Sequence, residues 1–283
     1  MSIEWYPGHI AKARREIKES IKNVDIVIEI LDARAPISTK SDFVDDISSN
    51  KILFIILNKS DLSDSKKNKE YVEYYKKNNY IVNLVISKNS DVKVIIDKMI
   101  NEYCQDKIDK LKSKGITDPI LKAMVVGLPN VGKSTFINNY VKKKIAKAEN
   151  KPGVTRANQW IKLSDKLLLL DTPGITSPKF RNDIVGENLI LLGSLNEKLA
   201  VKQDIVFNFL NYLKSNYLNN LIDRYDLDNI SEDTETIEIF DLIANKTGSI
   251  KSGKKIDYDR TSDIIIDDFR TGRLGKITLH EVL

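Results

Sequence analysis

The chain has 283 residues, which suits about two domains and allows a proper hydrophobic core. It has no apolar run of transmembrane length and no signal-peptide pattern at its polar N-terminus, so we expect a cytoplasmic protein with no membrane contact. The one cysteine, Cys104, excludes an internal disulfide and a cysteine-rich zinc site, and the net charge of +5 is only mildly basic. Lysine clusters at 12–18, 142–147 and 246–255 suit phosphate backbones, although such clusters are usually solvated surface.

The apolar pattern of the first half predicts helices that alternate with strands. The expected elements are a helix over 7–22, a strand over 25–32, a loop over 32–38, a helix near 41–49, a strand over 52–57, a helix over 66–78, a strand over 81–86 and a helix over 92–111. Cys104 is expected to be a buried thiol in the last of these helices. The alternation indicates an α/β fold with a parallel sheet.

The four residues NKSD at 58–61 follow directly on the continuous apolar run at 52–57, which is typical of a central parallel strand. NKxD is the guanine-reading element of GTPases, and ligands of open α/β sheets bind at the carboxyl ends of such strands. Asp61 would accept hydrogen bonds from the guanine N1–H and exocyclic amine. Asn58 would meet the O6/N7 edge, and the Lys59 stem would lie against the base. In a chain rich in lysine and asparagine, these residues could also form a solvated turn.

A second base-contacting loop is expected after the strand at 81–86. There Ser87 and Lys88 would contact the base through their backbone. The usual pattern in this loop is Ser-Ala-Lys, and Lys88 stands in the place of the alanine.

The segment GLPNVGKS at 127–134 matches the phosphate loop G-x4-G-K-[ST]. Its context agrees, because an apolar strand at 121–126 leads into it and a helix at 134–141 follows it. Glycines at the two fixed positions permit backbone conformations, and a close approach to phosphate, that a Cβ would block. The alternative is a glycine-containing strand-to-helix turn that binds nothing.

Within this loop, Lys133 would reach the β- and γ-phosphates, and the Ser134 hydroxyl would bind Mg²⁺. Backbone N–H groups of the loop and of the helix N-terminus would face the phosphates. The other residues expected to contact the nucleotide here are Asn130, Val131, Gly132 and Thr135.

DTPG at 171–174 follows a leucine strand at 167–170 and matches the element that senses the γ-phosphate. Asp171 would enter the Mg²⁺ shell, and the Gly174 N–H would meet the γ-phosphate. Thr155 is the expected switch threonine, which closes on Mg²⁺ and the γ-phosphate. The alternative is an ordinary loop threonine beside a flexible Pro-Gly pair.

The order of these motifs is rotated, because NKSD precedes the phosphate loop and DTPG, whereas an ordinary GTPase has its NKxD element last. This order predicts a circularly permuted P-loop GTPase domain over 1–178, with the segment 111–119 joining the original ends. An all-α domain is expected over 179–283, with helices at 186–223, at 234–246 and from 257, and with apolar spacing such as Ile205, Phe209, Tyr212 and Leu213. The switch after DTPG would run directly into this domain and could reorient it.

The residue after Gly174 is Ile175, whose aliphatic side chain cannot orient an attacking water as the glutamine of Ras-like proteins does. Hydrolysis is therefore either very slow or assisted by another group. Asn130 occupies the position at which potassium-activated GTPases hold K⁺, although an asparagine can equally cap the loop. His9 opens a basic amphipathic helix after Pro7-Gly8, where a histidine is more often a solvated or capping residue than a catalyst.

Seven segments of the chain carry a family resemblance. They are WYPGHIAKA (5–13), DIVIEILDARAPIS (25–38), NKSD (58–61), GLPNVGKS (127–134), KPGVTR (151–156), DTPGI (171–175) and DYDRTSDIIIDDFRTGRLGKITL (257–279). With them the chain resembles the ribosome-biogenesis GTPase A family, also called YlqF-type permuted GTPases, over nearly its whole length. The resemblance implies a GTP hydrolase that helps to mature the large ribosomal subunit, contacts rRNA and ribosomal proteins, and is stimulated by the particle.

The resemblance also implies roles for single residues. His9 matches the histidine of the family's PGH motif, to which catalysis is assigned, and Asn130 matches the asparagine linked to K⁺ activation. The helical domain resembles an RNA-binding module, although Lys254 and Lys255 stand where paired glycines are common. We expect a monomer that uses Mg²⁺ and K⁺.

Two other functions remain open from the sequence. One is an RNA-binding adaptor that holds GTP only as a structural ligand, which Ile175 permits. The other is a GTPase for tRNA modification or membrane transport, which the absence of a modification domain and of a membrane span disfavours. Use of ATP is disfavoured, because Asp61 and Asn58 would specify guanine.

Overall fold

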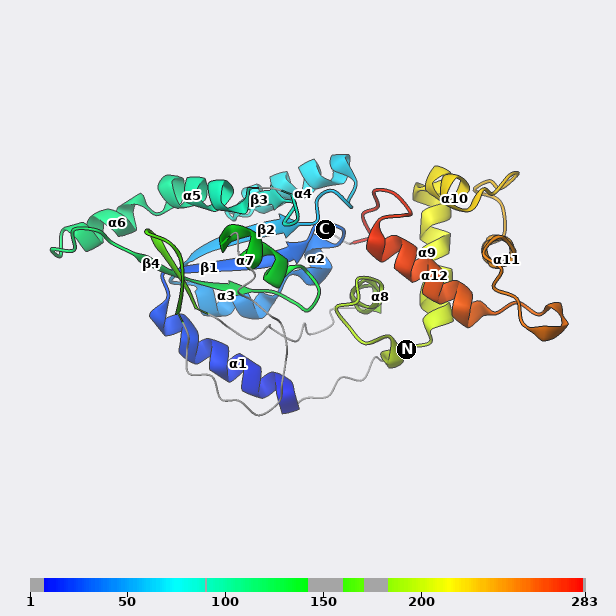
Figure 1. Cartoon of the computed structure of the whole chain (residues 1–283), viewed down its shortest axis with the longest axis horizontal. Helices are drawn as coiled ribbons and strands as arrows, with labels where there is room; N and C mark the ends of the chain where they lie inside the picture. Colours follow the sequence, from blue (N-terminus) through cyan, green and yellow to red (C-terminus); the bar gives the residue numbers. More distant parts are fainter. Residues whose placement is uncertain (1–7, 90, 142–159, 171–182, 282–283) are drawn as a thin grey trace. The chain divides into compact units, whose positions relative to one another are not determined.

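The computed structural model describes residues 8–89, 91–141, 160–170 and 183–281, with side chains from Arg14 onward (Figure 1). The chain divides into two compact units. Of the described residues, one unit contains 8–61, 65–89, 91–141 and 160–170, and the other contains 183–281 together with Leu62–Asp64. The predicted boundary between 178 and 179 falls outside the described residues, so the division into domains 1–178 and 179–283 stays a prediction.

A six-stranded sheet forms the first unit, in the order β3-β2-β1-β4-β6-β5. All neighbouring strands are parallel except β5, which runs antiparallel to β6. The strands are β1 (Ile26–Asp32), β2 (Ile52–Asn58), β3 (Ile81–Val85), β4 (Leu121–Val126), β5 (Trp160–Ser164) and β6 (Leu167–Leu170). The α/β class with a parallel sheet is confirmed, and every predicted strand is present.

The helices of this unit agree with the predicted ones in all but two places. They are α1 (Gly8–Ser20), α2 (Pro36–Thr39), α3 (Asp42–Ser48), α4 (Ser65–Lys77), α5 (Val92–Tyr103), α6 (Gln105–Lys112) and α7 (Lys133–Val141). The predicted loop over 32–38 contains the start of α2, which has proline at its first position, where a missing N–H costs nothing. The single helix predicted over 92–111 is wrong, because it breaks at Cys104.

The break at Cys104 follows from the side chains on its two sides. Before it, α5 buries an apolar stripe that includes Ile96 and Ile100. After it, α6 buries no residue, so no packing holds it in line with α5. Cys104 itself is fully buried as predicted, and burial together with the charge of Asp25 raises the pKa of its thiol to about 12. Such a thiol is unreactive in the folded protein.

Helices cover both faces of the sheet, along which side chains alternate. On one face, Val27 packs in a cluster with residues of α1 and α3, and Leu31 packs farther along against Tyr71 of α4. On the other face, Phe54 contacts Tyr103 of α5 edge-on, with ring centroids 6.5 Å apart. The central strands are therefore buried on both sides, which explains their near-continuous apolar sequences.

The helical unit contains five α-helices in its described part. They are α8 (Asp183–Leu191), α9 (Lys202–Asn216), α10 (Leu218–Tyr225), α11 (Thr236–Lys246) and α12 (Tyr258–Thr271). The stretch predicted to be helical over 186–223 is occupied by three separate α-helices, α8, α9 and α10. The predicted apolar spacing of α9 is confirmed: Ile205, Phe209 and Leu213 are buried, and the Phe209 ring lies 5.0 Å from that of Phe269 on α12.

One polar residue, Glu29, lies in the middle of the apolar strand β1 and is fully buried. Its carboxylate lies 3.0 Å from the Lys40 ammonium and accepts a hydrogen bond of 3.0 Å from the Ser41 N–H. Burial raises the pKa of Glu29 to about 7, although Lys40 acts in the opposite direction. In the unfolded chain the carboxyl ionises near pH 4.5, so between the two values unfolding releases a proton.

We expect Glu29→Gln to change the pH dependence of stability. The contribution of the wild-type carboxyl is fully present below pH 4.5 and is lost as pH rises through 7, since a rising pH favours the unfolded, ionised form. Relative to Glu29→Gln, the wild-type protein should lose up to about 3 kcal/mol of unfolding free energy over this range. Urea unfolding of both proteins at pH 5, 6, 7 and 8 measures the difference. A matched control is Glu70→Gln, which removes an exposed carboxylate paired with Lys67. A difference that stays constant with pH would contradict the prediction.

Candidate nucleotide-binding site

The predicted nucleotide-binding residues follow the carboxyl ends of neighbouring strands. Strand β1 ends at Asp32 and β2 at Asn58, and these two residues are paired in the parallel register. The phosphate loop follows β4, and Ser87 follows β3. Because parallel strands end at the same edge of a sheet, segments far apart in the sequence meet there.

The phosphate loop has the backbone that its glycines predict. Gly127 and Gly132 have φ angles of 152° and 101°. A Cβ on Gly127 would lie 2.5 Å from the Ile30 carbonyl oxygen, and one on Gly132 would lie 2.3 Å from the Asn58 amide nitrogen. Asn130 also has a positive φ of 62°, a conformation that asparagine tolerates better than most residues. Both glycines are therefore required by close approach as well as by conformation.

The Lys133 side chain lies folded over this loop. Its ammonium donates hydrogen bonds to the carbonyl oxygens of Gly127 (3.0 Å) and Leu128 (2.7 Å). An ammonium has three donors, so one more is available for a phosphate oxygen. Burial lowers the pKa of Lys133 to about 8, and a bound phosphate would oppose that shift. The geometry thus suits an ammonium that bridges the loop and an anion.

The Asn58 side chain joins two loops of the site. Its amide nitrogen donates to the Val131 carbonyl oxygen (2.8 Å), and its amide oxygen accepts from the Ser87 N–H (3.0 Å). The phosphate loop and the predicted base loop are thereby held to the end of β2. A direct contact between Asn58 and the guanine O6/N7 edge stays a prediction.

The Lys59 side chain makes a second connection to the phosphate loop. Its ammonium donates to the Asn130 carbonyl oxygen (2.6 Å) and to a carboxylate oxygen of Asp32 (2.8 Å). Asp32 is in turn bound by Arg34. No role of Asp32 or Arg34 was predicted from the sequence. Asp32 could have been identified in the same way as Asn58, because both are polar residues at the carboxyl end of a buried strand, and Arg34 follows two residues later.

The residues expected around the base differ in their exposure and in how they are held. Asp61 is half-buried, and Lys88 is exposed. The preceding Ser60 is held by β3, since its N–H and its hydroxyl both donate to the Val85 carbonyl oxygen. The Ser87 hydroxyl is buried and has no hydrogen-bond partner within the described part of the chain. An unsatisfied buried hydroxyl fits a loop whose hydrogen bonds are completed by a ligand.

The remaining predicted site residues divide between described and undescribed parts of the chain. Ser134 and Thr135 form the first turn of α7, where backbone N–H groups lack helical acceptors. For Mg²⁺, the Ser134 hydroxyl is an oxygen donor of the required kind at this helix start. The backbone of His9 lies in the first turn of α1, but its side chain is outside the described residues. Thr155, Asp171 and Gly174, as well as Ile175, also lie outside them.

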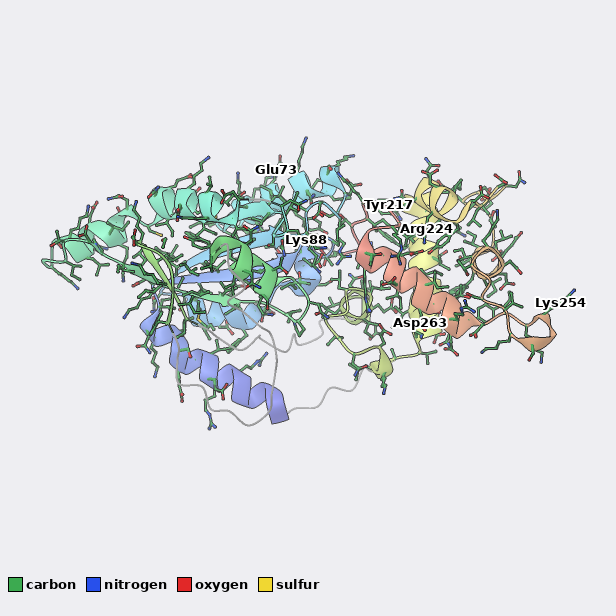
Figure 2. All side chains as sticks on the ribbon, viewed as in Figure 1. Glu73, Lys88, Tyr217, Arg224, Lys254 and Asp263 are labelled. Atoms are coloured by element: carbon green, nitrogen blue, oxygen red, sulfur yellow. The ribbon has the colours of Figure 1, made fainter. Side chains whose placement is uncertain are left out.

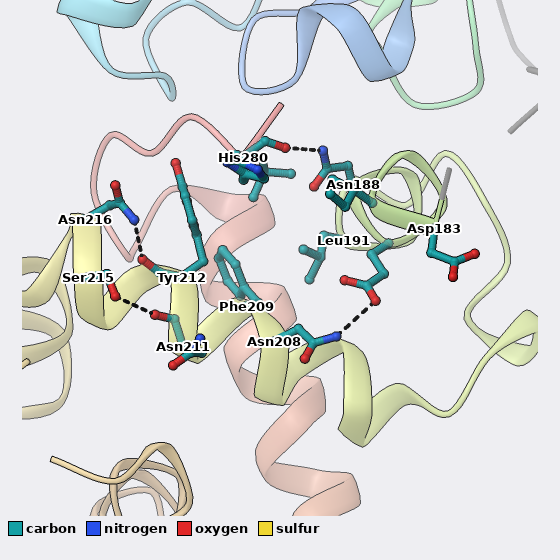
Figure 3. A pocket seen from close by; sticks show the side chains of 13 residues that line it. Asp183, Asn188, Leu191, Asn208, Phe209, Asn211, Tyr212, Ser215, Asn216 and His280 are labelled. Carbon is teal, nitrogen blue, oxygen red and sulfur yellow. Dashed lines mark hydrogen bonds between the residues drawn. The ribbon is translucent and has the colours of Figure 1, made fainter. Parts of the chain in front are cut away.

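A separate cavity of about 470 Å³ lies within the helical unit, between α8, α9 and the segment at 279–280 (Figure 3). Its lining combines amide, aromatic and acidic side chains, among them Glu187, Asn188, Asn208, Phe209, Tyr212 and His280. Several of these polar groups already bind one another, as Asn208 does with Glu187 at 3.0 Å. No residue of this cavity belongs to the predicted nucleotide-binding set.

Within the described ranges, none of the helices combines the length and the apolar character needed to cross a bilayer. The His, Cys, Asp and Glu side chains of the same ranges nowhere gather in a group of three that could hold a metal ion. The predicted Mg²⁺ ligands are of another kind, since they combine two hydroxyls with a single carboxylate.

Comparison with known proteins places this geometry in a family. Residues 122–248 match the family model described as "50S ribosome-binding GTPase". The ribosome biogenesis GTPase A of Bacillus licheniformis is 41% identical over 281 residues, with 99% of each chain covered. The ribosome biogenesis GTPase A of Thermotoga maritima is 31% identical over 277 residues, covering 98% of this chain and 93% of the relative.

Two solved structures have the same fold. The crystal structure of GNP-bound YlqF from T. maritima matches with a TM-score of 0.67 at 28% identity, covering 95% of this chain and 98% of the other. The GDP-bound structure of TM YlqF matches with a TM-score of 0.68 at 26% identity, covering 94% and 99%. With curated relatives this similar over nearly its whole length, the chain belongs to the ribosome biogenesis GTPase A family and is a GTPase.

Proposed function

We propose that this GTPase assists the assembly of the large ribosomal subunit. The observation that carries the proposal is the similarity over nearly the full chain to curated ribosome biogenesis GTPases. The fold supports it, because a phosphate loop and an NKSD segment meet at one edge of the sheet and are joined through Asn58 and Lys59. The protein would bind the ribosomal particle in its GTP-bound state, and the particle would stimulate hydrolysis.

At the nucleotide, Asp61 would read guanine, and the backbone of Ser87 and Lys88 would contact the base. The loop from Asn130 to Thr135 would surround the phosphates, with Lys133 on the β- and γ-phosphates. NKSD lies before the phosphate loop in the sequence, and this order supports a circular permutation of the GTPase domain. Thr155 and Gly174 would sense the γ-phosphate.

The nucleotide would be bound together with two cations, Mg²⁺ and K⁺. Mg²⁺ would be held by the Ser134 and Thr155 hydroxyls and by Asp171, and it would neutralise charge on the phosphates. K⁺ would be held near Asn130, with His9 as a catalytic group supplied by the N-terminal helix. The exposed position of Asn130 supports access of an ion to this part of the loop. Hydrolysis assayed in potassium and in sodium salts tests the K⁺ assignment.

Charge is distributed unevenly along the chain, which bears on the partners. Residues 1–179 contain 32 Lys and Arg against 22 Asp and Glu, a net charge of +10, whereas residues 180–283 contain 13 against 18, a net charge of −5. A negative surface repels an RNA backbone. RNA contacts of the helical unit would therefore be confined to its basic cluster at 246–255, and its acidic remainder would suit basic ribosomal proteins.

The basic cluster begins at Lys246, the last residue of α11, and continues through the connection to α12. Lys246 is paired with Asp226 and Lys251 with Asp257. Lys254 and Lys255 are exposed, and Lys254 lies at the outer end of the connection (Figure 2). These two lysines are therefore the best candidates in the helical unit for contacts with phosphate.

Sedimentation with purified large subunits tests the proposed function. We expect the wild-type protein to co-sediment more strongly with a GTP analogue than with GDP. Reversing the charge at Lys254 and Lys255 to glutamate should weaken binding about tenfold. The slope of log affinity against log salt concentration should fall by the amount expected for about two phosphate contacts. Lys276→Glu changes an exposed lysine of the same unit outside the cluster and serves as the control. Equal sedimentation in both nucleotide states, or no binding to the large subunit, would refute the proposal.

A further inference from the structure

The Asp32 carboxylate is a fully buried hydrogen-bond acceptor at the carboxyl end of β1. One of its oxygens accepts from the Arg34 backbone N–H (3.1 Å) and from the Arg34 Nε (2.9 Å). The other accepts from the Arg34 Nη2 (2.9 Å) and from the Lys59 Nζ (2.8 Å). Burial alone would raise the pKa of Asp32, but Arg34 and Lys59 hold it well below its usual range. The group is therefore a carboxylate with four donors on its two oxygens.

Lys59 connects this carboxylate to the phosphate loop. Its ammonium spans from Asp32 to the Asn130 carbonyl oxygen, and its own backbone has a positive φ of 59°. Burial lowers the pKa of Lys59, and Asp32 counteracts that effect. A long lysine side chain has many rotamers, so a fixed acceptor on each side of the ammonium restricts where its stem can lie.

We propose that Asp32 is a positioning residue for the guanine nucleotide, which holds the Lys59 stem in the base site and the Asn130 carbonyl in the phosphate loop, and that Arg34 fixes Asp32 in this role. The inference rests on the proposed assignment of NKSD as the base-reading segment. Asp32 and Arg34 would not touch the nucleotide. They act through Lys59, because a lysine without its counter-charge would turn toward water and release the phosphate loop.

Glu29 gives the matched comparison within the same strand. Both carboxylates are fully buried on β1, and each is paired with a lysine. The partner of Glu29 is Lys40, which also pairs with Asp45 of α3 and has no bond to a nucleotide-binding residue among those described. Loss of Glu29 should affect folding alone, whereas loss of Asp32 should affect nucleotide affinity.

A double-mutant cycle on the full chain tests the proposal, with equilibrium binding of fluorescent GDP as the measurement. Asp32→Asn keeps the shape of the side chain but removes its charge, and we expect about tenfold to hundredfold weaker binding. Lys59→Met keeps the stem but removes the ammonium. In the Lys59→Met background, Asp32→Asn should cost little further affinity, because its action passes through that ammonium. Glu29→Gln should bind GDP as the wild type does.

Two outcomes would overturn the inference: wild-type affinity in Asp32→Asn, or the same loss in both backgrounds. Arg34→Lys keeps the charge but loses the paired contact with Asp32, so it should also weaken GDP binding. If Asp32→Asn does not fold, Arg34→Lys serves as the test variant in its place. Wild-type protein that fails to bind GDP would refute the nucleotide-site assignment itself. Wild-type binding with an unchanged Asp32→Asn would refute the positioning role alone.

Discussion

Replacing Asp61 with asparagine is expected to change the base that the protein selects from guanine to xanthine. The carboxylate accepts hydrogen bonds from both the N1–H and the exocyclic amine of guanine. An asparagine keeps one acceptor for the N1–H but presents an N–H group to the amine, so two donors meet. Xanthine has a carbonyl in place of the amine and would accept from that N–H. Mismatched polar groups of this kind let a site reject the wrong ligand by about four orders of magnitude, so the preference for guanine over xanthine should fall by about that factor.

Competition binding with GDP, XDP and ADP against a fluorescent nucleotide measures this change. Asp64→Asn makes the same chemical substitution three residues later and should keep the preference for guanine. Tight binding of ADP that Asp61→Asn leaves unchanged would mean that the NKSD segment does not read the base. The half-buried position of Asp61 after β2 leaves the carboxylate accessible to a ligand.

Replacing Lys133 with methionine is expected to reduce the hydrolysis rate by about a hundredfold to a thousandfold. The ammonium is held above the phosphate loop by the Gly127 and Leu128 carbonyl oxygens, so its third N–H is oriented before the phosphate arrives. Preorganised donors that meet developing charge account for losses of this size when they are removed. Methionine retains the stem and avoids opening a cavity.

Single-turnover release of phosphate, measured with saturating GTP and large subunits, gives the rate independently of product release. Lys122→Met changes an exposed lysine of the strand that leads into the loop and should hydrolyse GTP as the wild type does. A rate within threefold of wild type for Lys133→Met, at full nucleotide occupancy, would show that another group supplies the charge.

The parts of the site that could be predicted from the sequence are those encoded in short continuous segments. Gly127 and Gly132 have the backbone angles that the phosphate-loop pattern requires. The apolar run before NKSD is a buried central strand, and Asn58 lies at its end. In each case one segment carries both the structural and the chemical signal.

The parts that could not be predicted depend on contacts between segments. The ion pair between Asp32 and Lys59 exists because β1 and β2 end in register, which no local pattern states. Glu29 lies within an apolar run, and its partner Lys40 is brought close to it only because the chain turns back through α2. The break at Cys104 likewise depends on whether the following helix packs against anything.

That break gives the protein a natural probe of its own stability. The chain has a single cysteine, and Cys104 is fully buried at the junction of α5 and α6 with its thiol pKa raised to about 12. A thiol reagent can therefore modify it only when this junction opens. The rate of labelling, followed by mass spectrometry, would report the free energy of opening at this junction without an added fluorophore. Bound nucleotide should slow the labelling if it stabilises this unit.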